Sequence, residues 1–364
     1  MLCIRMLPRL ISLLVLLFAS ALPVLAQEQP DPVGELADQA VQEWVNQPAF
    51  TLERLTGLST IEVCELLPAA LVNPPPAEGT RVNVNDRIEL PTSDPDVRLF
   101  SYSAAGAAGQ LHVVQATMVR TGDSWSVQQV GFRQPPPSGL RAWVQTPPAS
   151  WVFGALSLMV VVLLLRPSPL RRWLGMALGV IRQHRRLYVF SMALLFGVFA
   201  FGAYTGSQLP DECTAAVFEA VAGAVSLVGA TQAYDSGSVA RAAVVTFHQN
   251  FVVVTLSVLF SLAMVFGVPA YLFGMISFFT QAIPFGMVGG LVGIELLFMV
   301  LLLLLELTAY FTVVAGGGFL LATLIRQGFS SFPQAVGKLL LMLPVAMVLL
   351  LAGAWYEALI LVSW

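Results

Sequence analysis

Glu306 is the residue whose type and position point most directly to chemistry. It lies in an apolar run from Glu295 to Ile325, and Glu295 is the other acidic residue of that run. On one helix, a separation of 11 residues puts both carboxylates on nearly the same face. Glu306 would lie about 16 Å beyond Glu295 along the helix axis. Because a membrane core is about 30 Å thick, this places Glu306 near mid-membrane.

A carboxylate at mid-membrane costs about 2.5–3.5 kcal/mol on insertion scales, so such a residue is by default a candidate for function. One interpretation is a proton relay or an ion path. The other is a protonated Glu306 that forms a hydrogen bond across a helix interface and holds the bundle together. The residue pattern leaves both interpretations open.

Several polar residues are candidates to share a site with Glu306. Tyr310 follows it by one helical turn, and Gly317 continues the same stripe. His248 and Asn250 lie at the expected outer mouth of another span. Gln281 lies inside a further span, so a transporter or channel would place Glu306, Gln281 and His248 along one path.

Glycines recur at four-residue spacing in the apolar runs, as in Gly202 and Gly206 and again in Gly286 and Gly290. This spacing lets helix backbones approach closely and predicts compact packing of the spans. A continuous helix from Glu295 to Ile325 would be about 46 Å long, well beyond the thickness of the membrane core. We therefore expect a break at the cluster that contains Gly316 and Gly317.

Motifs for catalysis and for metal binding are missing from the sequence. It contains no His-Glu-x-x-His, no Gly-x-Ser-x-Gly and no Gly-rich phosphate loop. Its histidines, His112, His184 and His248, are expected in three separate regions. We therefore predict no enzymatic activity, no cofactor and no metal site.

Two cysteines are candidates for a disulfide. Cys64 lies in the expected exported domain and Cys213 in an expected outer loop. Both would lie in an oxidising compartment, where a disulfide bond can form and persist. The alternative is that both thiols remain free.

These candidate residues must be positioned by membrane-spanning helices. The chain has 364 residues, of which 57% are hydrophobic and 11% charged. Soluble domains average about 45–50% apolar and about 25% charged residues, so a water-soluble globule is excluded. Six apolar runs are candidate spans, namely residues 151–165, 187–204, 251–268, 271–293, 295–325 and 339–362. The predicted fold is mainly α, a polytopic α-helical membrane bundle in residues 150–364 preceded by a small exported α+β domain.

The distribution of charge predicts the topology. Residues 166–186 hold six arginines and no acid, a composition typical of a cytoplasmic loop. The amino-terminal domain and the carboxyl terminus are then expected outside the cell membrane. Residues 27–149 hold 7 Arg and 14 Asp or Glu, and this acidic balance excludes nucleic acid as a partner. The expected partners are the lipid bilayer and proteins of the bacterial envelope, and a homo-oligomer is an open alternative.

The amino terminus has the features of a signal peptide, predicted for residues 1–26. Arg5 and Arg9 precede an apolar stretch of 13 residues, Leu10–Leu22, and a cleavage site follows at Ala26. A spanning helix needs about 20 residues, so this stretch is short for a permanent anchor.

Residues 27–134 predict a small α+β domain. Helical spacing in Glu35–Val45 and Ile61–Leu71 is followed by segments of period two, which end in a hairpin around Gly122. The sequence VVQATMVRTGDSWSVQQVGF resembles the last hairpin of cystatin-like exported domains, which favours a binding module. The proline-rich residues 135–149 predict a semi-rigid tether to the membrane.

The chain from about Arg186 to Trp364 resembles the stage II sporulation protein M family. The resemblance is carried by RRLYVFSMALLFGVFAFGAYTGSQL, VVTFHQNFVVVTLSVLFSLAMVFGVP, LFGMISFFTQAIPFGMVGG and LLELTAYFTVVAGGGFLLATLI. It would put Asn250, Glu306, Gly316 and Gly317 on marked positions of the family. The chain departs from the family pattern at Gln281-Ala282, where Asn-Gly is usual, and in having leucines where Pro-His-Gly commonly precedes the glutamate. The resemblance implies a membrane scaffold.

Two functions follow from these observations. The first is a non-catalytic integral membrane protein that acts as a scaffold or anchor for an envelope complex through its exported domain. The alternative is a transporter or channel that uses the intramembrane carboxylate of Glu306.

Overall fold

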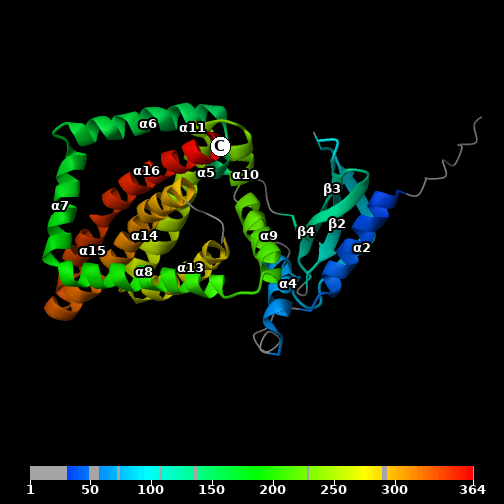
Figure 1. Ribbon diagram of the computed structural model, residues 1–364, viewed down its shortest axis with the longest axis horizontal. Coiled ribbons are helices and arrows are strands. Elements are labelled where there is room, and N and C mark those ends of the chain that lie inside the picture. Colours follow the sequence, from blue (N-terminus) through cyan, green and yellow to red (C-terminus); the bar gives the residue numbers. More distant parts are fainter. Residues whose placement is uncertain are drawn as a thin grey trace, which may run out of the picture. The chain divides into compact units, whose positions relative to one another are not determined.

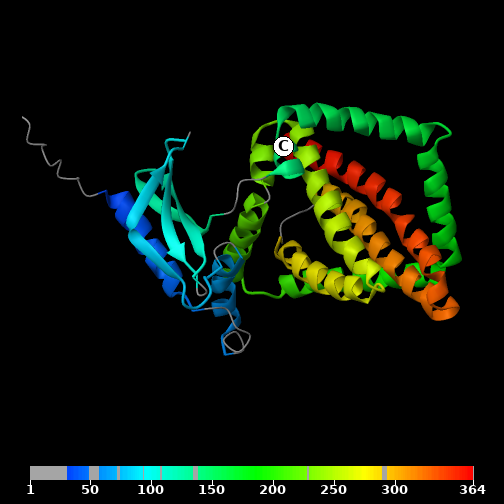
Figure 2. The same cartoon turned by 180° about the vertical axis from the view of Figure 1, so that it is seen from behind.

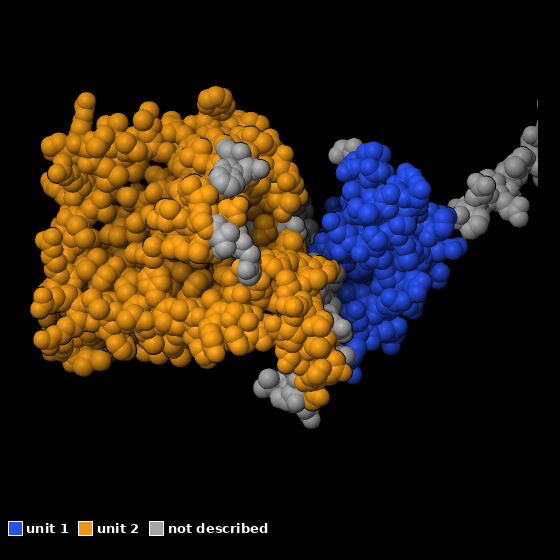
Figure 3. Space-filling model, in the orientation of Figure 1, with its two compact units in different colours: residues 1–49, 75–133 blue, residues 50–74, 134–364 orange. Residues whose placement is uncertain are grey.

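The computed structural model describes residues 31–48, 57–71, 74–92, 94–106, 109–133, 138–227, 229–288 and 293–363. The chain divides into two compact units, shown in different colours in Figure 3. Unit 1 contains residues 1–49 and 75–133, and unit 2 contains residues 50–74 and 134–364. The predicted signal peptide, residues 1–26, lies outside the described residues.

Unit 1 consists of a helix packed against one face of a four-stranded antiparallel sheet. The helix is α2 (Pro32–Asn46), and the strands follow one another in space in the order β1 (Arg81–Leu90), β2 (Val97–Ala105), β3 (Leu111–Thr121) and β4 (Ser124–Phe132). Gly122 has a φ of +64° in the turn between β3 and β4, a conformation that glycine adopts without strain. The predicted α+β architecture and its final hairpin are thus confirmed.

Alternation along the strands builds the core of unit 1. Phe100, Val114 and Met118 point to the same face of the sheet and are at most 1% exposed. Val41 and Trp44, one helical turn apart on α2, pack against them. A helix with a single apolar face must bury that face against another apolar surface. The apolar face of α2 and the apolar face of the sheet therefore form one core.

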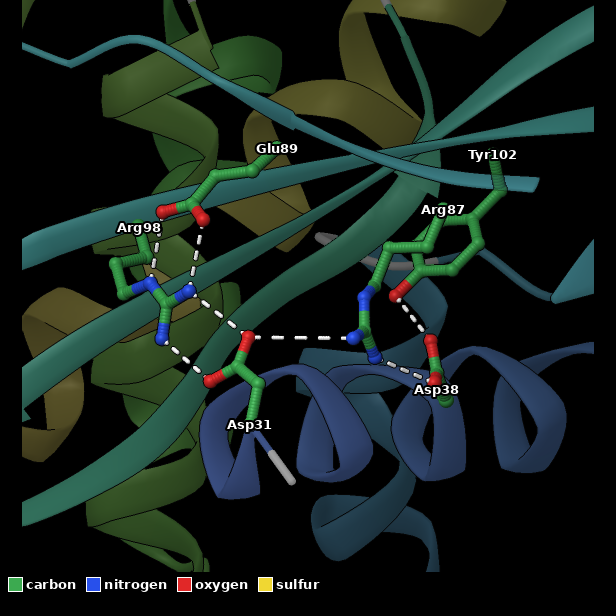
Figure 4. Close-up of polar contacts among 6 residues, drawn as sticks. All are labelled: Asp31, Asp38, Arg87, Glu89, Arg98 and Tyr102. Carbon is green, nitrogen blue, oxygen red and sulfur yellow. Dashed lines mark hydrogen bonds and ion pairs between the residues drawn. The ribbon is translucent and has the colours of Figure 1, made fainter. Parts of the chain in front are cut away.

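Ion pairs at the edge of this core hold α2 to the sheet (Figure 4). Arg98 of β2 binds both carboxylate oxygens of Asp31, at 2.8 and 2.9 Å, and also Glu89 of β1 at 2.8 Å. Arg87 binds Asp38 at 2.6 Å, and the Tyr102 hydroxyl donates to the other oxygen of Asp38 at 2.9 Å. The Arg98 guanidinium, through its hydrogen bonds, holds the pKa values of the Asp31 and Glu89 carboxyls below their ordinary values.

Replacing Arg98 by Gln is expected to destabilise the docking of α2 by about 1–2 kcal/mol at pH 7, because a bidentate ion pair is lost. Lowered pKa values in the folded state give stability that is complete above the unfolded values of 3.8 and 4.5. That contribution is lost as the pH falls through the folded values. Hydrogen exchange of the α2 amides in the full chain should therefore differ between wild type and R98Q at pH 7, and the difference should be smaller at a pH below the unfolded values. An equal difference at both pH values would contradict this assignment.

The described residues of unit 2 contain six helical segments long and apolar enough to cross a membrane, which confirms the predicted multi-pass class. They are Pro147–Leu165, Arg185–Ser207, Val239–Met264, Val268–Met287, Ile294–Gln327 and Phe329–Val362. The elements that form them are α6 (Pro147–Leu165), α8 (Arg185–Ser207), α11 (Val239–Phe247) with η1 (His248–Phe260) and α12 (Ser261–Met264), α13 (Val268–Met287), α14 (Ile294–Gln327), and η2 (Phe329–Ser331) with α15 (Phe332–Leu340) and α16 (Met342–Ser363). The third span begins at Val239 and not at residue 251, because α11 continues into it.

The remaining described helices of unit 2 connect or flank these spans (Figures 1 and 2). They are α4 (Thr60–Leu71), α5 (Gly139–Trp143), α7 (Pro169–Gln183), α9 (Glu212–Leu227) and α10 (Ala230–Asp235). The segment expected as a tether, residues 135–149, contains α5 and the first turn of α6 in its described part. Val144 is buried there against Phe153, so this part belongs to the core of the unit.

The centre of unit 2 is the second half of α14. Every residue from Ala309 to Leu320 is buried, so this stretch has neighbours on all sides. The expected break at Gly316 and Gly317 is wrong, because α14 runs through both. The glycines instead allow neighbouring segments of the chain to pack directly against the backbone of α14. A Cβ on Gly317 would lie 2.9 Å from the Cα of Gly267, and one on Gly316 would lie 2.8 Å from a methyl group of Leu339.

Residues 50–74 interrupt unit 1 in sequence but are grouped with unit 2. Within unit 2, Cys64 of α4 forms a disulfide with Cys213 of α9, at a sequence separation of 149 residues. The sequence places Ile61–Leu71 within an exported domain of residues 27–134. The packing of α4 on α9 instead makes this helix a part of the second unit.

Removal of the disulfide is expected to release α4. A disulfide that closes a long loop contributes about 2–5 kcal/mol, so a C64S/C213S variant should exchange its α4 amides at least about 30-fold faster than the oxidised wild type. Adding a reductant should accelerate exchange in the wild type and leave the variant unchanged. Free thiols at both positions in non-reducing mass spectrometry would contradict the pairing.

Candidate functional site

Five polar side chains in unit 2 form one hydrogen-bonded cluster. They are Tyr234 of α10, Thr246 of α11, Asn250 of η1, Glu306 of α14 and Glu357 of α16. They come from three spans, the first formed by α11 and η1, the second by α14 and the third by α16, and α10 lies outside the spans. We refer to these five residues as the carboxyl cluster.

Glu306 accepts a hydrogen bond from Asn250, whose Nδ2 lies 2.7 Å from the Glu306 Oε1. Glu306 lies where α14 changes its environment, since α14 is partly exposed before it and continuously buried soon after it. On this helix Glu306 lies about 18 Å from the first residue, Ile294. The sequence therefore identified both members of this contact.

Glu357 is the partner that the sequence analysis missed. Its carboxyl group lies within hydrogen-bonding reach of the Glu306 carboxyl, and both are only partly exposed. Gly353, one turn earlier on α16, allows this approach. A Cβ there would already touch the Glu306 Cγ at 3.4 Å. A signal was available, because Glu357 is the acid of the last apolar run, residues 339–362.

Tyr234 and Thr246 complete the cluster on its other side. The Tyr234 hydroxyl donates to the Glu357 Oε1 at 2.7 Å and lies 2.7 Å from the Thr246 hydroxyl. Because a tyrosine has one hydroxyl proton, Thr246 must be the donor in the second contact. Burial, and then the charge of Glu357, raise the pKa of Tyr234. Tyr234 therefore remains a donor at neutral pH.

The π-helix η1 supplies Asn250. Its wider turn is marked by Thr255, whose hydroxyl donates to the carbonyl oxygen of Asn250, five residues earlier, at 2.7 Å. Ser257 makes the same contact to Val252 at 2.9 Å. π-Helical segments are rare and are frequent at functional sites. The carbonyl of Asn250 is thus satisfied locally, and its side-chain amide is available to Glu306.

The chemistry of the cluster follows from its donors and acceptors. Asn250 donates to Glu306, and Tyr234 donates to Glu357. A hydrogen bond between the carboxyl groups of Glu306 and Glu357 requires a proton on one of them, since two carboxylates can only accept. The arrangement therefore stabilises a carboxyl pair that holds one proton. Such a pair can take up or release that proton.

Other predicted site residues lie outside the hydrogen-bonded cluster. Tyr310 is buried one turn further along α14, stacks on Phe278 at a centroid distance of 5.6 Å and interacts electrostatically with both carboxyl groups. His248 begins η1, but among the described hydrogen bonds Asn250 is the η1 side chain that reaches Glu306. Gln281 donates to Ser277 of its own helix at 2.7 Å.

The predicted glycine contacts are present where the structure describes them. A Cβ on Gly286 of α13 would lie 1.8 Å from the carbonyl oxygen of Ala203 on α8. One on Gly206 of α8 would lie 2.0 Å from the carbonyl oxygen of Ile283. These glycines bring the backbones of α8 and α13 together. Gly290 lies outside the described residues.

Among the described residues, no group of three or more His, Cys, Asp or Glu side chains is arranged to hold a metal ion. The carboxyl cluster offers two carboxyl groups, an amide and two hydroxyls. Comparisons of the chain with protein-family models, curated proteins and solved structures found no match.

Proposed function

We propose that this protein is a proton-coupled membrane transporter or channel in which Glu306 and Glu357 bind the coupling proton. The observation that carries the proposal is the contact between two carboxyl groups inside the spanning bundle. Ionisable residues inside a membrane are costly, and in pumps and transporters they form proton relays. Two such residues in contact are a stronger indication than Glu306 alone.

The position of Tyr234 supports a route for the proton. Tyr234 belongs to α10, which is not one of the six spans, and its neighbour Asp235 is exposed. The hydrogen bonds from Thr246 and Tyr234 to Glu357 therefore run from the boundary of the bundle to its interior. In the predicted topology this boundary faces the outside of the cell, since the arginines of residues 166–186 mark the opposite face.

A flux assay tests this function. Purified protein is reconstituted into liposomes that contain a pH-sensitive dye, and a pH gradient is imposed. Fractions of low-molecular-mass solutes from native cells are then added. Proton movement that depends on both the protein and one fraction is expected. Protein-containing liposomes that behave like empty ones with every fraction would overturn the proposal.

A scaffold for an envelope complex is the second candidate, and the sheet of unit 1 favours it. One sheet face is covered by α2, whereas the opposite face presents Leu111 and Val113, which are 86% and 40% exposed. The resemblance to the stage II sporulation protein M family is in line with this role. Isolation of the protein from native membranes with a stoichiometric envelope partner, which an L111E/V113E variant loses, would support the scaffold. Isolation without a partner would exclude it.

A further inference from the structure

The helix α7 of unit 2 has a different surface from the rest of the bundle. Figures 1 and 2 show α7 running crosswise between the end of α6 and the start of α8, both of which are candidate spans. A helix that joins the ends of two spans in this way lies along the membrane surface. Its apolar side is anchored, because Ala177 is fully buried against Phe319 and Met342 of the bundle.

The other side of α7 combines cations with apolar side chains. Arg171 and Arg172 are exposed, and Trp173 and Met176 are 50% and 49% exposed. A surface hollow of about 600 Å³ is lined by Pro169, Arg172, Trp173, Gly175 and Met176. These residues lie on one face of the first two turns of the helix. Tryptophan beside arginine is the combination found at the level of lipid headgroups.

The charge around α7 is entirely positive. Residues 166–186 hold six arginines and no acid, and the facing segment, residues 319–341, adds Arg326 and Lys338, again without an acid. Among the described residues, no ion pair engages these cations. Burial and the charges of Lys338 and Arg326 lower the pKa of His184, which reflects the same positive field.

We propose that the face of α7 formed by Pro169, Arg172, Trp173 and Met176, together with Arg171, binds an anionic phospholipid. The arginines would hold the phosphate of the headgroup, because guanidinium groups match phosphate oxygens in geometry and charge. The hollow over Trp173 and Met176 would take the upper part of an acyl chain. A soluble acidic partner would use the arginines but not the apolar residues between them, and so fits this face less well. The inference is independent of the proposed transport.

Brominated lipids, which quench tryptophan fluorescence on contact, test the proposal on the full-length protein. The protein is reconstituted in vesicles of phosphatidylcholine with a minor fraction of brominated phosphatidylglycerol, or of brominated phosphatidylcholine. The signal of Trp173 is obtained as the difference between wild type and W173F. We expect brominated phosphatidylglycerol to reach half-maximal quenching of Trp173 at about one-tenth of the mole fraction at which brominated phosphatidylcholine reaches it.

An R171Q/R172Q variant should lose most of this preference, since each arginine near a membrane surface contributes several-fold to anionic lipid binding. R120Q, which changes an exposed arginine of unit 1, is the control and should behave as wild type. Equal quenching by the two lipids, or an undiminished preference in R171Q/R172Q, would overturn the proposal. If free glycerol phosphate, at the same concentration as the brominated phosphatidylglycerol, abolished the quenching of Trp173, the ligand would be a soluble phosphate and the proposed lipid site would be overturned.

Discussion

Replacing Glu306 by Gln is expected to reduce proton-coupled flux to the level of empty liposomes while the protein still folds. The Gln side chain has nearly the shape of Glu. Its oxygen can accept the 2.7 Å hydrogen bond from Asn250, and its amide can donate to Glu357. Folding should therefore change by less than about 1 kcal/mol. The variant, however, has only one of the two carboxyl groups, so no proton can be shared between them.

The same helix offers a matched control. Glu295→Gln changes an exposed carboxylate of α14 and should leave flux and stability unchanged. Glu306→Ala is the opposite control, because it leaves the Asn250 side-chain amide without its acceptor, at a cost of about 1–3 kcal/mol. If E306Q folds and retains full flux, Glu306 serves only to hold the helices together.

Gly286→Ala is expected to have the largest effect on folding. The added Cβ would lie 1.8 Å from the carbonyl oxygen of Ala203, which is backbone and cannot rotate away. The helices α8 and α13 would have to separate along their whole contact, which includes Gly202 and Gly206. Overpacking costs about 1–3 kcal/mol even where side chains can adjust, so we expect at least about 3 kcal/mol. The yield of monodisperse protein in detergent and its thermal midpoint should both fall.

Gly197→Ala is the matched control for this prediction. Gly197 lies on α8 as well, but a Cβ there meets nothing within 4 Å. Alanine also has the higher helix propensity, so G197A should be neutral or slightly stabilising. A G286A variant as stable as G197A would contradict the observed packing of α8 against α13.

The sequence predicted the membrane spans well because their signal is physical and local. About 20 apolar residues suffice to cross a bilayer, and each of the six runs overlaps one of the six spanning segments found among the described residues. Segments of period two on either side of Gly122 likewise predicted the hairpin of unit 1, which the structure forms from Leu111–Thr121 and Ser124–Phe132. The grouping of α4 with α9 could not be predicted, because it depends on contacts between segments about 150 residues apart.

The glycine cluster of α14 shows where local rules fail. A run of glycines favours a break by its low helix propensity, yet α14 continues through it. The cost is offset by packing, because Gly317 lets α14 touch the backbone at Gly267. Which of these two effects dominates depends on neighbours that the sequence does not reveal.

The candidate site was predicted in part. Glu306 stood out because a polar side chain in an apolar run is rare, and Asn250 stood out by its place at the mouth of a predicted span. The structure brings the two side chains into contact. Glu357 has the same signal, but nothing in the sequence indicates that α16 presents it to Glu306. Tyr234 and Thr246 have no signal of their own, since single hydroxyl-bearing residues are common in such segments.

The most direct test of the account is infrared spectroscopy of the reconstituted protein, which detects the proton on a carboxyl group whatever the transported solute. We predict a carboxylic acid band in the wild type that changes when a pH gradient is imposed. The band should be absent from the E306Q/E357Q variant and present in E295Q. Identical spectra for wild type and E306Q/E357Q, or a band that does not respond to the gradient, would contradict a proton-exchanging carboxyl pair.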